Sequence, residues 1–253
     1  MLSDFAMKPA LVTGRNGLFP GEVRLLGPNS DLGDVCSLRY RAYRDAGWIS
    51  HRNDEKLRDH YDRLPGTLNL AAYKESGCVC AFRFTADEGD EEPNVMPFES
   101  MFPDVLASLK DRGLGKIAEM GRLAVAPDMP NPSFRSTLVM SMIRSASVLC
   151  YATDVDYTVV AVHKRLSRFY RSMFAFEFLA ESDEYNEITE PTHLLGRPLK
   201  AEKTPQNTRN RFFVIDEAEM ADARATIAAL RSAGEASTFT RTASSPASSS
   251  ALA

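Results

Sequence analysis

The sequence predicts a mixed α/β sheet with helices packed on it, of a size that fits one large domain or two small ones. Of its 253 residues, 44% are hydrophobic and 25% charged, as in ordinary globular proteins. Short apolar runs bounded by glycine and proline alternate with segments of helical period. Their order is strand, helix, antiparallel strands, strand, helix, strand, helix, strand, strand. This order is typical of a sheet with both parallel and antiparallel neighbours.

The first elements follow a weakly patterned lead-in over residues 1–20. A short strand is predicted at 22–26. Asn29 or Ser30 can cap a helix that runs to about Ala46, and Gly47 provides its left-handed stop. The polar stretch 51–66 reads as a loop or short helix, and a loop of this length is often a lid.

Two strands, 68–74 and 77–85, form a hairpin through the turn Glu75-Ser76-Gly77. Residues 86–97 are acidic and rich in turn-forming residues, and 97–111 have the apolar spacing of a helix. The strand expected next, 116–126, is apolar but carries two charges, Glu119 and Arg122. In a regular strand these two side chains point to opposite faces. A bulge at Gly121 is expected to bring both to one face, because a bulge inserts one extra residue.

The second half alternates helices and strands in the same way. Asn131 and Pro132 suit the start of a helix, and Asp216 can cap the last one. The expected elements are a helix 131–151, a strand 157–162, a helix 164–173, strands 176–181, 192–199 and 209–215, and a helix from 216 to about 232. The Ser/Ala-rich tail 235–253 is expected to be disordered.

Composition excludes several function classes. The net charge of −4 gives no drive towards nucleic acid. No apolar run reaches the roughly 20 residues of a membrane span, and no signal peptide is evident. The four cysteines have no zinc spacing and are expected to be buried thiols, which indicates a cytoplasmic protein. The four histidines are scattered, so no metal site is predicted.

Several motifs together resemble the GCN5-related N-acetyltransferase (GNAT) fold, and within it the N-acyl amino acid synthases and acyl-homoserine-lactone (autoinducer) synthases. They lie in order over residues 39–126: Arg39, Tyr43 and Gly47-Trp48; Asp59-x-x-Asp62; Arg83; the segment 96–103; and Glu119-x-x-Arg122. The segment from His163 to Glu177 is similar to the N-acyl amino acid synthases, with Ala175-Phe176 in place of their Gly-Phe. The resemblance covers about residues 22–199 and implies a mostly antiparallel sheet that is splayed between its fourth and fifth strands.

The resemblance implies a GNAT-like acyltransferase domain over residues 21–200, followed by a strand and helix at 201–234. It also implies transfer of a pantetheine-bound acyl group to an amine, with no tightly bound cofactor. Acetyl-CoA enzymes hold the pyrophosphate with a glycine-rich loop after the fourth strand. Here residues 126–137 contain three prolines, which lack N–H groups, and no glycine. An acyl carrier protein is therefore the favoured donor over acyl-CoA.

The resemblance also assigns candidate site residues, and the residues themselves leave alternatives open. Glu119 is either a general base or a partner of arginines. Arg122 is the second candidate catalytic residue. A backbone N–H near Val125 is the third candidate, as the donor that stabilises the oxyanion. Arg39, Asp59, Asp62 and Arg83 are expected in one charged network, with Arg83 as a candidate for holding the acceptor carboxylate. Trp48 either covers the acyl-pantetheine or belongs to the core. Because carrier proteins are acidic, a basic docking face is expected. The candidates are Arg135, Arg144, Lys164, Arg168 and Arg171. The alternative is that these residues form an ordinary solvated basic surface.

The leading hypothesis is thus an acyltransferase that moves a long-chain acyl group from an acyl carrier protein to an amino acid. A homoserine-lactone synthase using S-adenosylmethionine is the first alternative, and a short-chain acetyltransferase is disfavoured by the missing phosphate loop. From another class, a non-catalytic module that binds carrier proteins is disfavoured by the buried charges. The sequence leaves open the acyl length, the acceptor and the oligomeric state.

Overall fold

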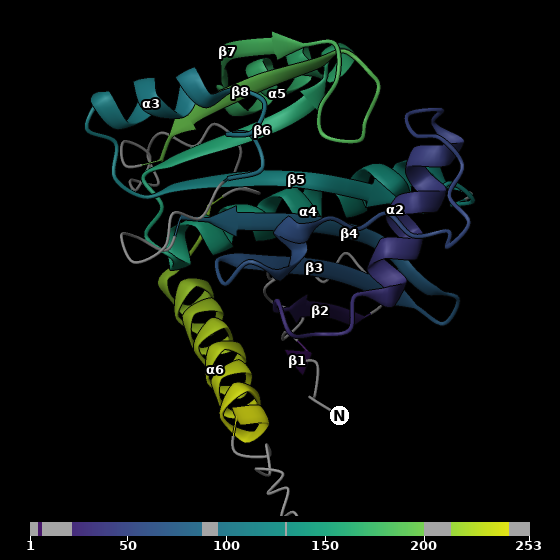
Figure 1. Cartoon of the computed structure of the whole chain (residues 1–253), viewed down its shortest axis with the longest axis vertical. Helices are drawn as coiled ribbons and strands as arrows, with labels where there is room; N and C mark the ends of the chain where they lie inside the picture. The colour runs from purple at the N-terminus through teal and green to yellow at the C-terminus, as the bar shows by residue number, and fades with distance from the viewer. Residues whose placement is uncertain (1–4, 7–21, 88–95, 130, 200–213, 243–253) are drawn as a thin grey trace, which may run out of the picture.

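The computed structural model describes residues 5–6, 22–87, 96–129, 131–199 and 214–242. In this part of the chain the strands form one sheet in the order β1-β2-β3-β4-β5-β6-β8-β7 (Figure 1). The strands are β1 (Phe5–Ala6), β2 (Glu22–Leu26), β3 (Thr67–Lys74), β4 (Gly77–Ala86), β5 (Ile117–Val125), β6 (Tyr157–His163), β7 (Glu177–Ser182) and β8 (Thr192–Pro198).

The sheet is antiparallel except at the β5–β6 pair, which is parallel. This pair is in register only from Ile117 opposite Tyr157 to Met120 opposite Val160. Beyond Met120 the two strands diverge, as Figure 1 shows. The predicted mixed, mostly antiparallel GNAT-like sheet is therefore confirmed. Its splay lies between β5 and β6, the strands that correspond to the fourth and fifth of the fold.

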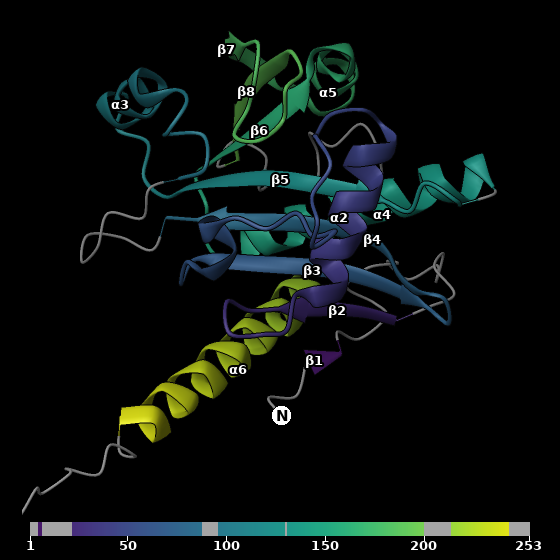
Figure 2. The same ribbon diagram turned by 45° about the vertical axis from the view of Figure 1, so that its right-hand side comes forward.

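Helices cover both faces of the sheet. They are α2 (Gly33–Asp45), α3 (Pro103–Asp111), α4 (Pro132–Ala152), α5 (Ser167–Phe174) and α6 (Glu217–Thr242), with short 3-10 helices η2 (His60–Arg63) and η3 (Lys164–Leu166). Figures 1 and 2 show α2 and α4 on opposite faces of the central strands, and α6 running away from the sheet. Among the described residues, no helix has the length and apolar character that crossing a bilayer requires.

The local signals at the helix ends are confirmed in most places. Gly47 has a φ of 75° after α2, and Asn131 accepts the N–H of Phe134 at the start of α4. The start of α2 differs from the prediction. The helix begins at Gly33 rather than near Ser30, because the Ser30 hydroxyl accepts the N–H of Gly27 instead and Asp31 accepts that of Gly33.

The ends of the chain also differ from the prediction. Phe5 and Ala6 of the expected lead-in form β1 beside β2. Asp216 and Glu219 cap α6 reciprocally, but this helix continues to Thr242 rather than ending near 232, so residues 235–242 of the expected disordered tail are helical. The strand expected at 209–215 falls largely outside the described residues, as does the rest of the tail.

Candidate active site

The central strand β5 carries the predicted bulge, but one residue later than expected. Ala124 pairs with Ala81 and Gly121 pairs with Arg83, so Arg122 and Leu123 together lie opposite the single residue Phe82. Arg122 adopts a left-handed φ of 55°, a conformation that costs a non-glycine residue about 1 kcal/mol. Such strain in a buried strand is a mark of a functional position.

Gly121 has a different role from the one predicted. It lies in regular register with Arg83, and a Cβ added there would stand 3.4 Å from Oε1 of Glu119. A small side chain at this position would thus be in ordinary van der Waals contact with the Glu119 carboxylate. The bulge was expected to present Glu119 and Arg122 as a charged pair. Instead, Arg122 and Arg83 both reach the same aspartate, Asp59.

A buried network of charges lies beneath the bulge. Asp59 accepts from Nη1 of Arg83 at 2.5 Å and from Nη2 of Arg122 at 2.7 Å. Asp62 accepts from Nη1 of Arg39 at 2.8 Å and from Arg83 at 3.3 Å. Arg39 also donates to the side chain of Asn69, the cross-strand neighbour of Arg83, at 2.5 Å. The segment 51–66 is therefore fixed to the sheet by ion pairs rather than free to act as a lid.

The arginines control the protonation of this network. Burial raises the pKa of Asp59, but the charges of Arg83 and Arg122 outweigh it and lower that pKa to about 2. Burial lowers the pKa of Arg83, whereas Asp59, Asp62 and Glu119 raise it above its ordinary value. Asp59 and Arg83 are thus both charged at neutral pH.

The lowered pKa of Asp59 predicts a loss of stability in acid. A carboxylate whose pKa falls from 3.8 to about 2 on folding stabilises the protein above the higher value. The contribution is about 2 kcal/mol and disappears as the pH falls through both values. In urea unfolding from about pH 5 to about pH 2, the stability difference between wild type and Asp59→Asn is expected to shrink by about 2 kcal/mol. A difference that does not vary with pH would contradict this assignment.

Glu119 is not an ion-pair partner of the arginines among the described residues. Its carboxylate accepts the N–H of Phe98 at 2.7 Å and the hydroxyl of Tyr185 at 2.6 Å. Burial raises the pKa of Glu119, in opposition to the Tyr185 hydrogen bond and the charge of Arg83. Both carboxylate oxygens are occupied, so Glu119 anchors the segments that carry Phe98 and Tyr185.

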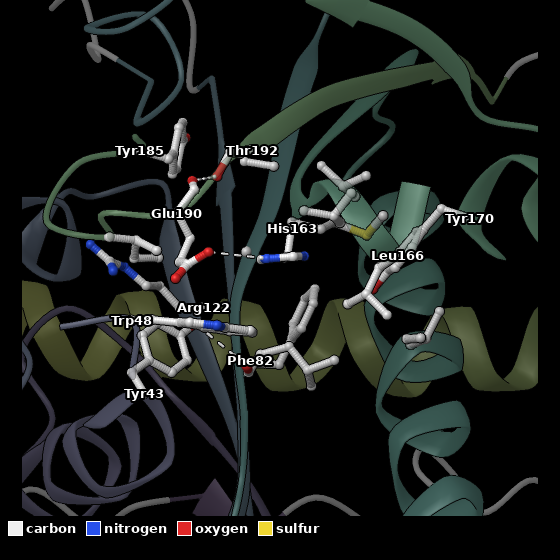
Figure 3. A pocket seen from close by; sticks show the side chains of 18 residues that line it. Tyr43, Trp48, Phe82, Arg122, His163, Leu166, Tyr170, Tyr185, Glu190 and Thr192 are labelled. Carbon is white, nitrogen blue, oxygen red and sulfur yellow. Dashed lines mark hydrogen bonds and ion pairs between the residues drawn. The ribbon is translucent and has the colours of Figure 1, made fainter. Parts of the chain in front are cut away.

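A cleft opens where β5 and β6 separate (Figure 3). Its walls come from the end of β6, the bulge of β5, α2, η3 and α5, and the loop 183–191 between β7 and β8. The residues that line it are Tyr43, Trp48, Phe82, Met120, Gly121, Arg122, Leu123, Ile143, Val160, Ala161, Val162, His163, Leu166, Tyr170, Tyr185, Ile188, Glu190 and Thr192. The space within it is about 780 Å³, part of which is open to solvent.

Of the predicted substrate-binding and catalytic side chains, Trp48 and Arg122 line the cleft, whereas the others lie behind its wall. Nη1 of Arg122 is buried and has no hydrogen-bond partner. By contrast, Arg83 is 2% exposed, is paired with Asp59 and Asp62, and does not line the cleft. The expected network is therefore present, but it supports the site from behind.

The loop 183–191 contributes Glu190, which pairs with His163 at the end of β6, and the sequence did not reveal this pair. Nε2 of His163 lies 3.4 Å from Oε2 of Glu190, and the His163 ring is nearly parallel to that of Trp48 at an angle of 10°. Trp48 in turn accepts the N–H of Thr189 through its carbonyl at 3.1 Å. The connection of nine residues between these antiparallel strands is longer than a hairpin needs. Its length is the feature of the sequence that could have indicated a functional loop.

The basic residues predicted for docking divide into two groups. Lys164, Arg168 and Arg171 are exposed around α5, and Arg135 is exposed near the start of α4. Arg144 is not at the surface: it is 4% exposed and binds both carboxylate oxygens of Glu219 at 2.7 and 2.8 Å. Its place at the α4–α6 contact removes it from the docking face. The described residues contain no group of three acidic, histidine or cysteine side chains suited to a metal ion.

Comparison with known proteins places this geometry in a family. A comparison with curated protein sequences gave no significant match. Among solved structures, the chain is similar to FeeM, an N-acyl amino acid synthase from uncultured soil microbes, with a TM-score of 0.52 and 16% identity over 69% of this chain and 88% of that one. It is also similar to the acyl-homoserine-lactone synthase LasI, with a TM-score of 0.49 and 16% identity over 70% of this chain and 90% of that one.

A third similar structure is BjaI, a CoA-dependent acyl-homoserine lactone synthase, with a TM-score of 0.49 and 14% identity over 81% of this chain and 88% of that one. At 16% identity, the match to the FeeM structure shows the fold alone. The sequence comparison is more specific, because the model of the family described as N-acyl amino acid synthase FeeM matches residues 34–198, more than half of the chain. The chain therefore belongs to the FeeM family of N-acyl amino acid synthases, which are acyltransferases.

Proposed function

We propose that the protein transfers an acyl group from the phosphopantetheine of an acyl carrier protein to the amine of an amino acid. The observation that carries the proposal is the cleft between β5 and β6, with a strained bulge and a cationic side chain in its wall. Strands that separate leave backbone groups without a ladder partner, and these groups can hold the amide-like pantetheine arm. A cytoplasmic location remains a prediction.

The bulge is well placed to stabilise the oxyanion of the reaction. The N–H of Ala126 bonds to the carbonyl of Val79 on β4. Because successive N–H groups of an extended strand alternate in direction, that of Val125 faces the side from which β6 has diverged. A fixed N–H aimed at the developing charge of a tetrahedral intermediate contributes about 3 kcal/mol in well-studied acyl transferases. The proposed donor is therefore the backbone N–H of Val125.

Arg122, rather than Arg83, is the proposed anchor for the acceptor carboxylate. A buried guanidinium N–H without a partner is costly. Nη1 of Arg122 is such a group, and Arg122 is one of the residues that line the cleft. A carboxylate would supply the missing acceptor with a charge-assisted hydrogen bond. The second nitrogen of Arg122 is held by Asp59, which fixes the guanidinium in place.

The carrier protein is proposed to dock on α5. Leu166, Phe169 and Met173 are 46%, 39% and 49% exposed, so these apolar side chains are partly uncovered. The exposed Lys164, Arg168 and Arg171 lie in the same segment, and apolar patches with charged rims are typical of docking sites. Leu166 also lines the cleft, so a carrier bound here would present its pantetheine at the entrance.

Charge reversal at this face tests the docking proposal. Arg168→Glu is expected to lower kcat/KM for acyl carrier protein about tenfold at low salt, with a smaller effect at high salt. The same variant is expected to use a free acyl-pantetheine donor as well as wild type does. Lys110→Glu, an exposed charge reversal on α3, is the matched control. Equal losses with both donors would show that the effect does not arise from docking.

The function itself is tested by product analysis. The protein is incubated with long-chain acyl carrier protein and each amino acid in turn, and separately with S-adenosylmethionine, and the products are identified by mass spectrometry. An N-acyl amino acid is the expected product. An acyl-homoserine lactone formed only from S-adenosylmethionine would replace the proposal with the lactone synthase. Carrier binding without any product would indicate a non-catalytic module.

A further inference from the structure

The cleft contains one carboxylate among its described lining residues, that of Glu190. The other ionisable groups that line it are Arg122 of β5, His163 of β6, Tyr43 of α2, Tyr170 of α5 and Tyr185 of the same loop. Burial raises the pKa of each of these tyrosines, that of Tyr170 to about 12, so the phenols are neutral near pH 7. Glu190 is therefore the group in the cleft that can attract a cation.

The hydrogen-bond partners of His163 define which of its ring nitrogens carries the proton. Its Nδ1 accepts the backbone N–H of Arg165 at 3.1 Å, so this nitrogen carries no proton. The proton of the neutral ring is then on Nε2, 3.4 Å from the Glu190 carboxylate. Neutral His163 has no free lone pair and cannot itself accept a proton. Instead it donates towards Glu190 and directs that carboxylate into the cleft.

Further contacts hold this pair in place. The Trp48 ring lies nearly parallel to that of His163, with centroids 5.6 Å apart, and the carbonyl of Trp48 holds the neighbouring Thr189. Thr192 donates its hydroxyl to the Glu190 carbonyl at 3.0 Å. Figure 3 shows the Glu190 carboxylate pointing towards His163, above the Trp48 ring and between His163 and the Arg122 side chain.

Building on the proposed function, we infer that Glu190 binds the ammonium group of the acceptor amino acid and removes its proton, with His163 as the residue that positions Glu190. Amino acids arrive as ammonium ions, which are not nucleophiles. With Arg122 on the carboxylate and Glu190 on the ammonium, the cleft matches a free α-amino acid in its zwitterionic form. Glu119 does not have this role, because both its oxygens accept hydrogen bonds within the protein and it does not line the cleft.

The proton and bond changes balance as follows. The ammonium gives one proton to Glu190, and the free amine attacks the thioester carbonyl to form the C–N bond. The tetrahedral intermediate collapses, the C–S bond breaks, and the departing thiolate takes a second proton from the nitrogen. Glu190 then returns its proton to solvent. The products are an N-acyl amino acid and the free thiol of the carrier.

The test compares Glu190→Gln with wild type in the acyl-carrier assay across pH. The variant is expected to lose about 100-fold in kcat/KM at pH 7, the scale of general base catalysis. Its rate should then rise about tenfold per pH unit in alkaline solution, because only the acceptor that is already neutral reacts. Glu187→Gln, in the same loop and ion-paired with Arg52 at the surface, is the control and should match wild type.

Two further variants secure the result. Glu190→Asp keeps a carboxylate, so it should retain the wild-type pH profile even if its rate is lower. If Glu190→Gln does not fold, this pH profile still tests the role of the carboxylate. His163→Gln keeps an N–H donor and should exceed His163→Ala in activity. Activity of folded Glu190→Gln within about twofold of wild type at pH 7 would overturn the inference, while leaving the acyl transfer itself intact. A wild-type protein that makes no N-acyl amino acid would instead refute the proposed function.

Discussion

Replacing Asp59 by alanine is expected to lower the free energy of unfolding by about 3–5 kcal/mol. Asp59 binds two arginine side chains, those of Arg83 and Arg122, which are 2% and 4% exposed. Without Asp59, Arg83 retains Asp62, but Arg122 loses its ion-pair partner among the described residues. A buried charge without a partner costs far more than the pair itself contributes. Urea unfolding followed by the fluorescence of Trp48, the single tryptophan, measures the effect.

The matched control is Asp54→Ala. Asp54 lies in the same segment and pairs with Arg58 at 3.5 Å, but the two side chains are 46% and 67% exposed. Exposed pairs contribute less than about 1 kcal/mol, so this variant should be nearly as stable as wild type. Similar losses in the two variants would mean that the network beneath the bulge does not stabilise the fold as its geometry indicates.

Replacing Arg122 by alanine is expected to lower kcat/KM for the amino acid acceptor by about 100-fold or more. The substitution removes a charge-assisted hydrogen bond to the acceptor carboxylate and leaves Asp59 with one arginine. Because Arg83 still neutralises Asp59, the variant should fold, which a melting curve checks. The experiment measures initial rates with saturating acyl carrier protein and varied acceptor.

A methyl ester of the same amino acid separates recognition from a general loss of structure. Wild type should strongly prefer the free amino acid, whereas Arg122→Ala should use the two acceptors about equally. Arg52→Ala, which removes a half-exposed arginine paired with Glu187, should keep the wild-type preference. A preference that persists in Arg122→Ala would place the carboxylate elsewhere.

Much of the fold followed from local signals, because glycine, proline and capping residues act on their own neighbourhood. The hairpin of β3 and β4, Gly47, Asn131 and Asp216 are examples. The bulge shows the limit of this reasoning. Glycine is the residue that tolerates a positive φ, so Gly121 was the natural choice, yet Arg122 adopts the strained conformation. Gly121 lies in regular register opposite Arg83, so the strained position depends on long-range strand pairing.

The charged residues of the site could be predicted from the sequence, but their positions relative to the cleft could not. These residues were recognisable because buried charges stand out within apolar strands. Which of them faces the cleft depends on long-range contacts that no local pattern encodes. Arg144 is hidden by Glu219, and Glu190 is brought to the cleft by the contact of Thr189 with Trp48, which is 141 residues away in sequence. Such contacts form only when the whole sheet is assembled.

The central claim is that acyl transfer takes place in the cleft between β5 and β6. A crystal structure with the N-acyl amino acid product bound tests it most directly. The account predicts the amide of the product beside the bulge at Arg122 and Leu123, and its carboxylate within hydrogen-bond distance of Nη1 of Arg122. A product bound outside this cleft, or a carboxylate held by Arg83, would contradict it.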